Sequence, residues 1–174
     1  MLVTSVEGDD RRRRPDELIV EEPMSIQLDG TLVATTMRTP GHDYELAVGT
    51  CFTDGLLGGA AVRGVRYCAD GSAMASHFNV VTVETGGAAP APTPRLSTTT
   101  SSCGLCGTES IDALVDRLAT LPPSEPIPLD VLRAIPDEVL GSQGLFAATG
   151  AVHAAAAFDR DGRVLLARED VGRH

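Results

Sequence analysis

The chain has 174 residues, of which 43% are hydrophobic, enough for one domain or two small ones with a buried core. Its net charge of −10 disfavours general binding to nucleic acid or to an anionic membrane. All 14 basic residues are Arg and none is Lys, which excludes P-loop and Schiff-base lysine chemistry.

Residues 1–14 contain four consecutive arginines at 11–14, and we expect them to form a disordered tail. No apolar stretch follows the arginines, so the pattern of an export signal is missing. No segment reaches the ~18 apolar residues that a membrane span needs. Four cysteines without an export signal predict reduced thiols, so we expect a cytoplasmic protein with no membrane partner.

Residues 15–85 are predicted to form a β-rich part with one helix. Apolar side chains alternate with polar ones from Met24, and an Asp29-Gly30 turn follows, which predicts a hairpin over 24–37. Further strands are predicted over 62–67 and 78–83.

One helix is predicted between these strands. Tyr44, Ala47, Val48 and Cys51 recur at the spacing of a single helix face. Asp43 is the expected cap of this helix, and the glycines at 58–59 are its expected end.

Residues 86–107 are predicted to be a mobile linker followed by a loop with the pattern C-x-x-C. Pro and Gly are dense over 86–100, and no periodicity is present. The loop holds Cys103 and Cys106, each followed closely by glycine.

Residues 108–174 are predicted to contain helices and a second hairpin. Helical spacing over 111–118 and 129–140 predicts two helices, and Pro136 is expected to kink or divide the second. Residues 145–152 fit either a helix or a strand. Extended segments at 154–158 and 164–167 flank a turn and predict the hairpin.

The two thiols of the loop are compatible with several chemistries. A structural zinc site needs four ligands, and only Cys51 and Cys68 remain, so we expect no metal site. Zinc deaminases place their His and Glu before the C-x-x-C, whereas His153 follows it here. These two arguments disfavour zinc chemistry but do not decide what else the two thiols do.

Three roles for Cys103 and Cys106 stay open. A dithiol oxidoreductase usually has its C-x-x-C directly after a strand, and here a linker precedes it. A sulfur carrier needs an accessible, nucleophilic thiolate on a loop that reaches both donor and acceptor, which this loop suits. Two bystander thiols in a tight loop are the third possibility.

Other polar residues permit two interpretations each. Arg38 suits either a cofactor phosphate or an ordinary surface ion pair. His153 suits either a hydrogen-bonded core position or a site. Arg168, Asp170 and Arg173, with Glu169, suit either a structural ion-pair cluster or a loop at a cofactor cleft.

Three sequence blocks together resemble the formate dehydrogenase accessory sulfurtransferases, the FdhD/NarQ family. They are M-R-T-P-G-H-D-Y-E-L-A-V-G at 37–49 with F-T-D-G-L at 52–56, S-S-C-G-L-C-G at 101–107, and T-G-A-V-H-A-A-A at 149–156 with R-E-D-V-G-R-H at 168–174. A single C-x-x-C is weak evidence, but three blocks in the family's order span residues ~17–174.

The resemblance implies a fold and a function. The fold is mixed α/β (α+β): a β-rich N-terminal part, then the opening of a cytidine-deaminase-like α/β/α sandwich. Cys103 resembles the family's persulfide cysteine, and Cys106 its partner, which relays sulfur or closes a disulfide. Sulfur would come from a cysteine desulfurase and pass to the molybdenum cofactor (bis-molybdopterin guanine dinucleotide) before that cofactor enters formate dehydrogenase.

The resemblance also implies the remaining site residues and partners. The cofactor contacts expected by position are Arg38, His153, Arg168, Asp170 and Arg173. The cofactor is a sulfur acceptor rather than a permanently bound group, and we expect a homodimer. Members of the family continue after the R-E-D-V-G-R-H block, so the resemblance implies a truncated chain with an incomplete sandwich. A non-catalytic, cofactor-binding maturation chaperone and a dithiol oxidoreductase are the alternatives.

Overall fold

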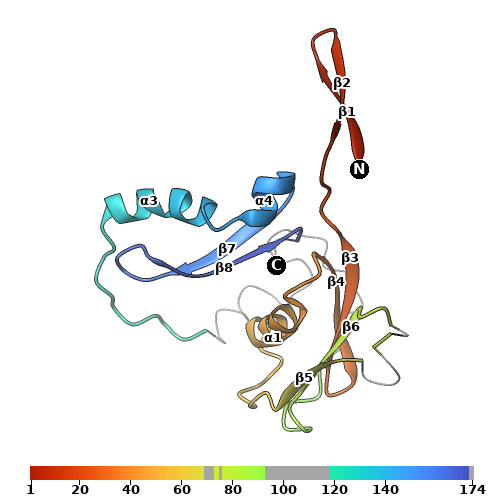
Figure 1. Ribbon diagram of the computed structural model, residues 1–174. Coiled ribbons are helices and arrows are strands. Elements are labelled where there is room, and N and C mark those ends of the chain that lie inside the picture. The colour runs from red at the N-terminus through yellow and green to blue at the C-terminus, as the bar shows by residue number, and fades with distance from the viewer. Residues whose placement is uncertain (69–72, 75, 93–117, 173–174) are drawn as a thin grey trace. The chain divides into compact units, whose positions relative to one another are not determined.

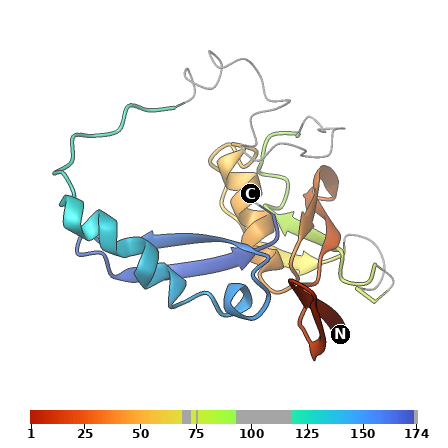
Figure 2. The same ribbon diagram turned by 90° about the horizontal axis from the view of Figure 1, so that it is seen from above.

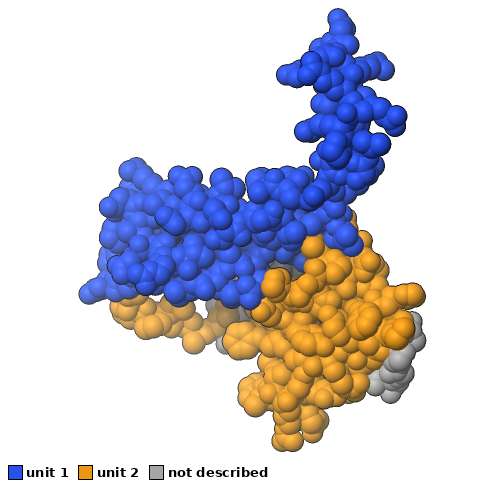
Figure 3. Space-filling model, viewed as in Figure 1, with its two compact units in different colours: residues 1–20, 125–171 blue, residues 21–124, 172–174 orange. Residues whose placement is uncertain are grey.

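The computed structural model describes residues 1–68, 73–74, 76–92 and 118–172. These residues form two compact units, coloured separately in Figure 3. The first unit comprises residues 1–20 and 125–171, and the second comprises residues 21–124 and 172–174. Strands and helices occur in both, which confirms the mixed α+β class; the cytidine-deaminase-like sandwich stays a prediction.

A four-stranded sheet is the centre of the second unit (Figure 1). Its strands lie in the order β4-β3-β6-β5, and β3 pairs antiparallel with β4 but parallel with β6. The hairpin predicted over 24–37 is confirmed, as are both later strands. The strands are β3 (Glu22–Leu28), β4 (Thr31–Arg38), β5 (Gly64–Tyr67) and β6 (Val80–Glu84).

The core of this unit lies between the sheet and the helix α1 (Asp43–Thr53), which packs on β6, β3 and β5 (Figure 2). Alternate side chains of β3 point into it, because successive residues of a strand face opposite sides. Helix α1 contributes Ala47 and Cys51, as its spacing predicts. The fully enclosed side chains from the three elements are Met24, Ile26, Leu28, Ala47, Cys51, Val81 and Val83.

Helix α1 ends earlier than predicted. Gly55 adopts a φ of 70°, and its amide donates to the carbonyl of Phe52 at 3.0 Å. The amide of Leu56 donates to Cys51 at 2.9 Å. These two bonds form a Schellman motif, in which a left-handed glycine satisfies the last carbonyls of the helix. The helix therefore ends at Thr53, and the prediction that the glycines at 58–59 end it is wrong.

The first unit contains two hairpins and two helices. Helix α3 (Leu129–Leu140) confirms the predicted helix and packs on β8, and Pro136 does not divide it (Figures 1 and 2). Residues left open between helix and strand form α4 (Gly144–Thr149). The predicted second hairpin is confirmed as β7 (His153–Phe158) and β8 (Val164–Asp170), which pair antiparallel.

The N-terminal residues form a hairpin, so the expectation of a disordered tail is wrong. Strands β1 (Leu2–Glu7) and β2 (Asp10–Pro15) pair antiparallel around a two-residue turn. Gly8 in this turn has a φ of 62°, which suits a two-residue hairpin. The prediction failed because four consecutive charges conceal the alternation by which a strand is recognised. In the described residues, no helix is long and apolar enough to cross a bilayer.

Candidate functional site

The first of the three sequence blocks, residues 37–49 with 52–56, folds around a buried ion pair. Arg38 ends β4 and Asp43 begins α1, and only 2% and 3% of their side chains are exposed. Arg38 Nη2 lies 3.0 Å from Asp43 Oδ2, and Nε lies 3.3 Å from Oδ1. This bidentate ion pair holds the end of β4 against the start of α1.

Arg38 has little capacity left for a ligand. Besides Asp43, its guanidinium donates to the carboxylate and the carbonyl of Glu22 and to the carbonyl of Phe78, at 3.3–3.4 Å. The five contacts match the five N–H donors of a guanidinium. The interpretation as a surface ion pair is therefore wrong, and this enclosure disfavours a cofactor phosphate as a further partner.

Asp43 does not cap α1 in the predicted way. The N-cap position is His42, which makes no side-chain cap bond. The Asp43 carboxylate instead accepts from Arg38, from the amide of Gly41 at 3.2 Å and from the hydroxyl of Tyr67 at 3.2 Å. Burial, and then the charge of Asp43, raise the pKa of Tyr67, so its hydroxyl keeps the proton that it donates.

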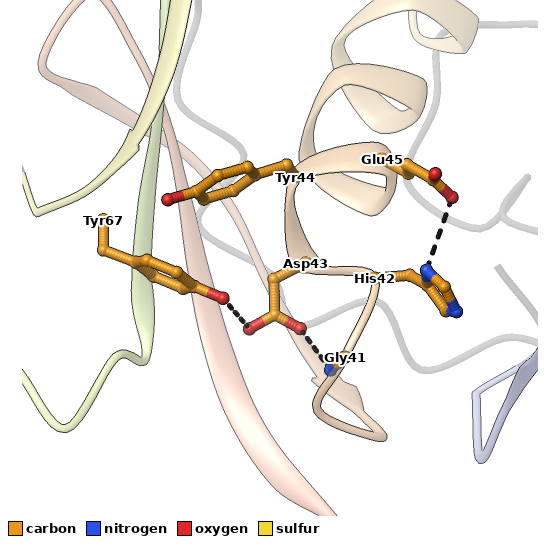
Figure 4. Close-up of a pocket in the computed structure, with 6 residues that line it drawn as sticks. All are labelled: Gly41, His42, Asp43, Tyr44, Glu45 and Tyr67. Atoms are coloured by element: carbon orange, nitrogen blue, oxygen red, sulfur yellow. Dashed lines mark hydrogen bonds and ion pairs between the residues drawn. The ribbon is translucent and has the colours of Figure 1, made fainter.

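A pocket of about 260 Å³ lies beside this network (Figure 4). On one side of the pocket, the ring centroids of Tyr44 and Tyr67 lie 4.9 Å apart. On the other side, His42 Nδ1 lies 3.7 Å from Glu45 Oε2. A phosphate in this pocket would face the carboxylates of Asp43 and Glu45, which disfavours it. The lining residues are Gly41, His42, Asp43, Tyr44, Glu45 and Tyr67.

The third sequence block comes together on the β7–β8 hairpin. His153 pairs directly with Asp170, and Ala155 pairs with Arg168. Directly opposed residues share a face, and so do residues two apart on one strand. His153, Arg168 and Asp170 therefore share one face at one end of the hairpin. His153 is exposed, so its interpretation as a core histidine is wrong.

Glu169 faces the opposite side and has a structural partner. Its carboxylate accepts the amides of Leu145 at 2.9 Å and Phe146 at 2.7 Å, which begin α4. A carboxylate at this position satisfies amides that lack a partner within the helix and suits the helix dipole. Sequence spacing does not predict this contact, because Glu169 is 24 residues from Leu145.

Tyr67 and Glu22, which complete the network around Arg38 and Asp43, are two further residues that the sequence does not predict.

The described cysteines are both buried. Cys51 is fully enclosed in the core, and burial together with the nearby charge of Asp54 raises its pKa to about 11. Cys68 is 4% exposed, with Sγ 3.2 Å from Ser76 Oγ. Cys103, Cys106 and Arg173 lie outside the described residues. Within the described part, no group of three or more His, Cys, Asp or Glu residues is arranged to hold a metal.

Comparisons with known proteins place the chain in a family. The model of the FdhD/NarQ family matches residues 19–174. The chain is 42% identical to the "Sulfur carrier protein FdhD" of Mycolicibacterium paratuberculosis, covering 92% of this chain and 62% of that protein. It is also 42% identical to the protein of the same name from Streptomyces avermitilis, and the match covers 92% of this chain and 60% of that protein.

A solved structure shares the fold. It is described as the crystal structure of a putative formate dehydrogenase accessory protein from Desulfotalea psychrophila, with a TM-score of 0.71 and 20% identity. The match covers 99% of this chain and 62% of that one. The chain thus spans about three fifths of the length of these relatives. From the match over residues 19–174 and the 42% identity, we conclude that this chain belongs to the FdhD/NarQ family.

Proposed function

We propose that this chain is a sulfur carrier that receives sulfur from a cysteine desulfurase on Cys103. It delivers the sulfur to the molybdenum cofactor before the cofactor enters formate dehydrogenase. The relatives' name, sulfur carrier protein FdhD, supports the role of sulfur carrier. The donor, the acceptor and the client enzyme rest on the resemblance of the three sequence blocks.

The burial of Cys51 and Cys68 is the observation that carries the choice of thiol. The chain has four cysteines. Two of them are enclosed at 0% and 4% exposure, and a pKa of about 11 leaves Cys51 almost wholly protonated at neutral pH. The nucleophile in sulfur exchange is a thiolate that the donor can reach. Cys103 and Cys106 are the cysteines left for this role.

The chemistry follows ordinary thiol exchange. The Cys103 thiolate attacks the outer sulfur of the desulfurase persulfide, the donor's S–S bond breaks, and the donor leaves as a thiolate. Cys103 then holds the outer sulfur as a persulfide. Attack of the Cys106 thiolate on the inner sulfur forms a Cys103–Cys106 disulfide and releases the outer sulfur as sulfide for the metal of the acceptor. A cellular dithiol reduces the disulfide for the next cycle.

The acceptor side is assigned to the face of β7–β8 that carries His153, Arg168 and Asp170. A guanidinium and an imidazole suit contacts with phosphate or with the heterocycle of the cofactor. We assign Arg38 a supporting role instead, because its guanidinium is enclosed by protein acceptors. Arg173 remains a proposed contact on the strength of the resemblance.

Sulfur loading tests the proposal directly. The chain is incubated with a cysteine desulfurase and cysteine, and intact mass and peptide mapping locate any added sulfur atom. We expect one added sulfur on Cys103, its loss in Cys103→Ala, and its retention in Cys51→Ala, a control at a buried thiol. Persistence of the Cys103 persulfide in Cys106→Ala would assign the release of sulfur to Cys106. Added sulfur on Cys106 itself would assign it a relay role.

Two other outcomes support the alternatives. If no sulfur is added but the chain reduces the disulfides of insulin, a dithiol oxidoreductase is the better description. If Cys103→Ala loads nothing yet restores formate dehydrogenase activity in cells that lack their own protein, the chain acts as a maturation chaperone.

A further inference from the structure

The hairpin β1–β2 has no role in the proposed sulfur transfer and precedes the region that matches the family. The match begins at residue 19, whereas the hairpin ends at Pro15. All six residues of β2 are exposed, and four of them are arginines. In the described part of the chain, β2 pairs only with β1, so its outer edge is open.

The four arginines divide between the two faces of the hairpin. Arg12 forms an ion pair with Asp10 at 2.7 Å, and Arg14 lies 3.9 Å from Asp16. Arg11 and Arg13 point to the other face, because side chains alternate along a strand. Neither makes an ion pair with any residue that the structure describes.

The opposite strand gives these two arginines uncharged neighbours. Arg11 pairs with Val6, and Arg13 pairs with Thr4. Val6 is 60% exposed, and Leu2 on the same face is 63% exposed. This face of the hairpin therefore combines two positive charges with accessible apolar surface.

The backbone of Arg11 and Arg13 also points away from β1. Met1 and Asp16 exchange both backbone hydrogen bonds, at 2.7 and 2.8 Å. Hydrogen-bonded pairs alternate with non-bonded pairs along an antiparallel ladder. The backbone N–H and C=O groups of Arg14, Arg12 and Asp10 therefore bond to β1. The backbone N–H and C=O groups of Arg11 and Arg13 face the open edge.

We propose that β2 is a docking edge for an extended segment of a partner protein that carries acidic side chains at alternate positions. Such a segment bonds to the outward groups of Arg11 and Arg13 as an added strand. Its acidic residues then lie directly opposite the two arginines on the same face, where opposite charges are favourable.

The charge of β2 selects against other occupants. A second copy of this chain pairing β2 with β2 would place arginine beside arginine, and like charges directly opposite are destabilising. Arginines on an open edge also discourage unselective strand pairing, which leaves acidic segments as the favoured partners.

The test measures binding of the full chain to a fluorescein-labelled peptide of alternating glutamate and valine. A peptide with glutamine in place of glutamate is the control probe. The variants R11Q/R13Q and R12Q/R14Q remove the same charge from opposite faces. We expect R11Q/R13Q to weaken binding about fivefold or more and R12Q/R14Q to weaken it less than about twofold.

A third variant tests the added strand itself. Arg13→Pro removes an outward N–H that β1 does not use, a change that edge strands tolerate. We expect it to weaken binding more than Arg13→Gln does, while circular dichroism and melting stay unchanged. The proposal is overturned if the glutamate peptide does not bind, if it binds no better than the glutamine peptide, or if both double variants weaken it equally.

Discussion

Asp43 and Arg38 form a buried ion pair with a separation of 3.0 Å that joins the first turn of α1 to the last residue of β4. The pair is surrounded by hydrogen bonds to Gly41, Tyr67 and Glu22, so little of either charge is left without a partner. Removing one member of such a pair leaves the other buried without compensation.

We therefore predict that Asp43→Asn lowers the free energy of unfolding by about 3 kcal/mol or more. Arg66→Gln is the matched control, because Arg66 and Glu84 form an ion pair in which both side chains are substantially exposed. Exposed pairs contribute about 0–1 kcal/mol, so the control should change little. Urea unfolding followed by circular dichroism measures both. Equal effects of the two substitutions would contradict a buried, structural pair.

The sequence predicts elements well where one residue pattern extends over the whole element. The alternation from Met24 and the helical spacing through Cys51 each reflect one face that packs on the core. The second hairpin is predicted for a similar reason, since two extended segments flank a turn.

Contacts between distant segments are what the sequence does not predict. The parallel pairing of β3 with β6 joins residues 55 positions apart, such as Ser25 and Val80, and no local pattern encodes it. The same holds for Glu169 at the start of α4. Asp43 illustrates a competition: its position suits a cap, but the nearby Arg38 is a stronger partner for its carboxylate.

Asp29 gives the fold a dependence on pH. Its carboxylate accepts the amide of Thr85 at 2.7 Å, the amide of Gly86 at 3.1 Å and the hydroxyl of Thr85. The Thr85 hydroxyl, and then these amides, lower the pKa of Asp29 below its ordinary 3.8, although burial opposes them. A carboxyl whose pKa is lower in the folded chain stabilises the fold at pH values above its pKa in the unfolded chain. This contribution is lost as the pH falls through its pKa in the folded chain.

We accordingly predict that Asp29→Asn destabilises the protein at neutral pH but not at pH values below the lowered pKa. Asn tolerates the φ of 48° at this position, so the substitution changes the charge and leaves the turn intact. Unfolding at a series of pH values from 7 downward measures the difference. Thr85→Val should reduce the same pH dependence, and a difference independent of pH would contradict the assignment.

Glu169 should hold the start of α4. Replacing a capping side chain by Ala costs about 1 kcal/mol, which corresponds to about a fivefold change in a local opening equilibrium. Hydrogen exchange at the amides of Leu145 and Phe146 should therefore accelerate about fivefold in Glu169→Ala. Asp170→Ala is the neighbouring control, because Asp170 points to the other face of β8. Unchanged exchange in Glu169→Ala would contradict the capping role.

Cys51 should behave as a core residue rather than as a reactive thiol. Its pKa of about 11 leaves roughly one thiolate per thousand at pH 8, and its side chain is fully enclosed. We expect iodoacetamide to label Cys103 and Cys106 in the folded chain and to reach Cys51 only after urea is added. Peptide mapping by mass spectrometry distinguishes the sites.

The raised pKa of Cys51 also fixes a direction for stability at alkaline pH. Above pH 9.0, the ordinary pKa of the thiol, the unfolded chain releases the Cys51 proton while the folded chain retains it up to about pH 11. Stability therefore falls across this range as the pH rises, because the unfolded state binds fewer protons. Cys51→Ala removes that contribution, so its free energy of unfolding should fall less between pH 9 and pH 11 than that of the unsubstituted chain. An equal fall in both proteins would show that Cys51 ionises as easily in the core as in water.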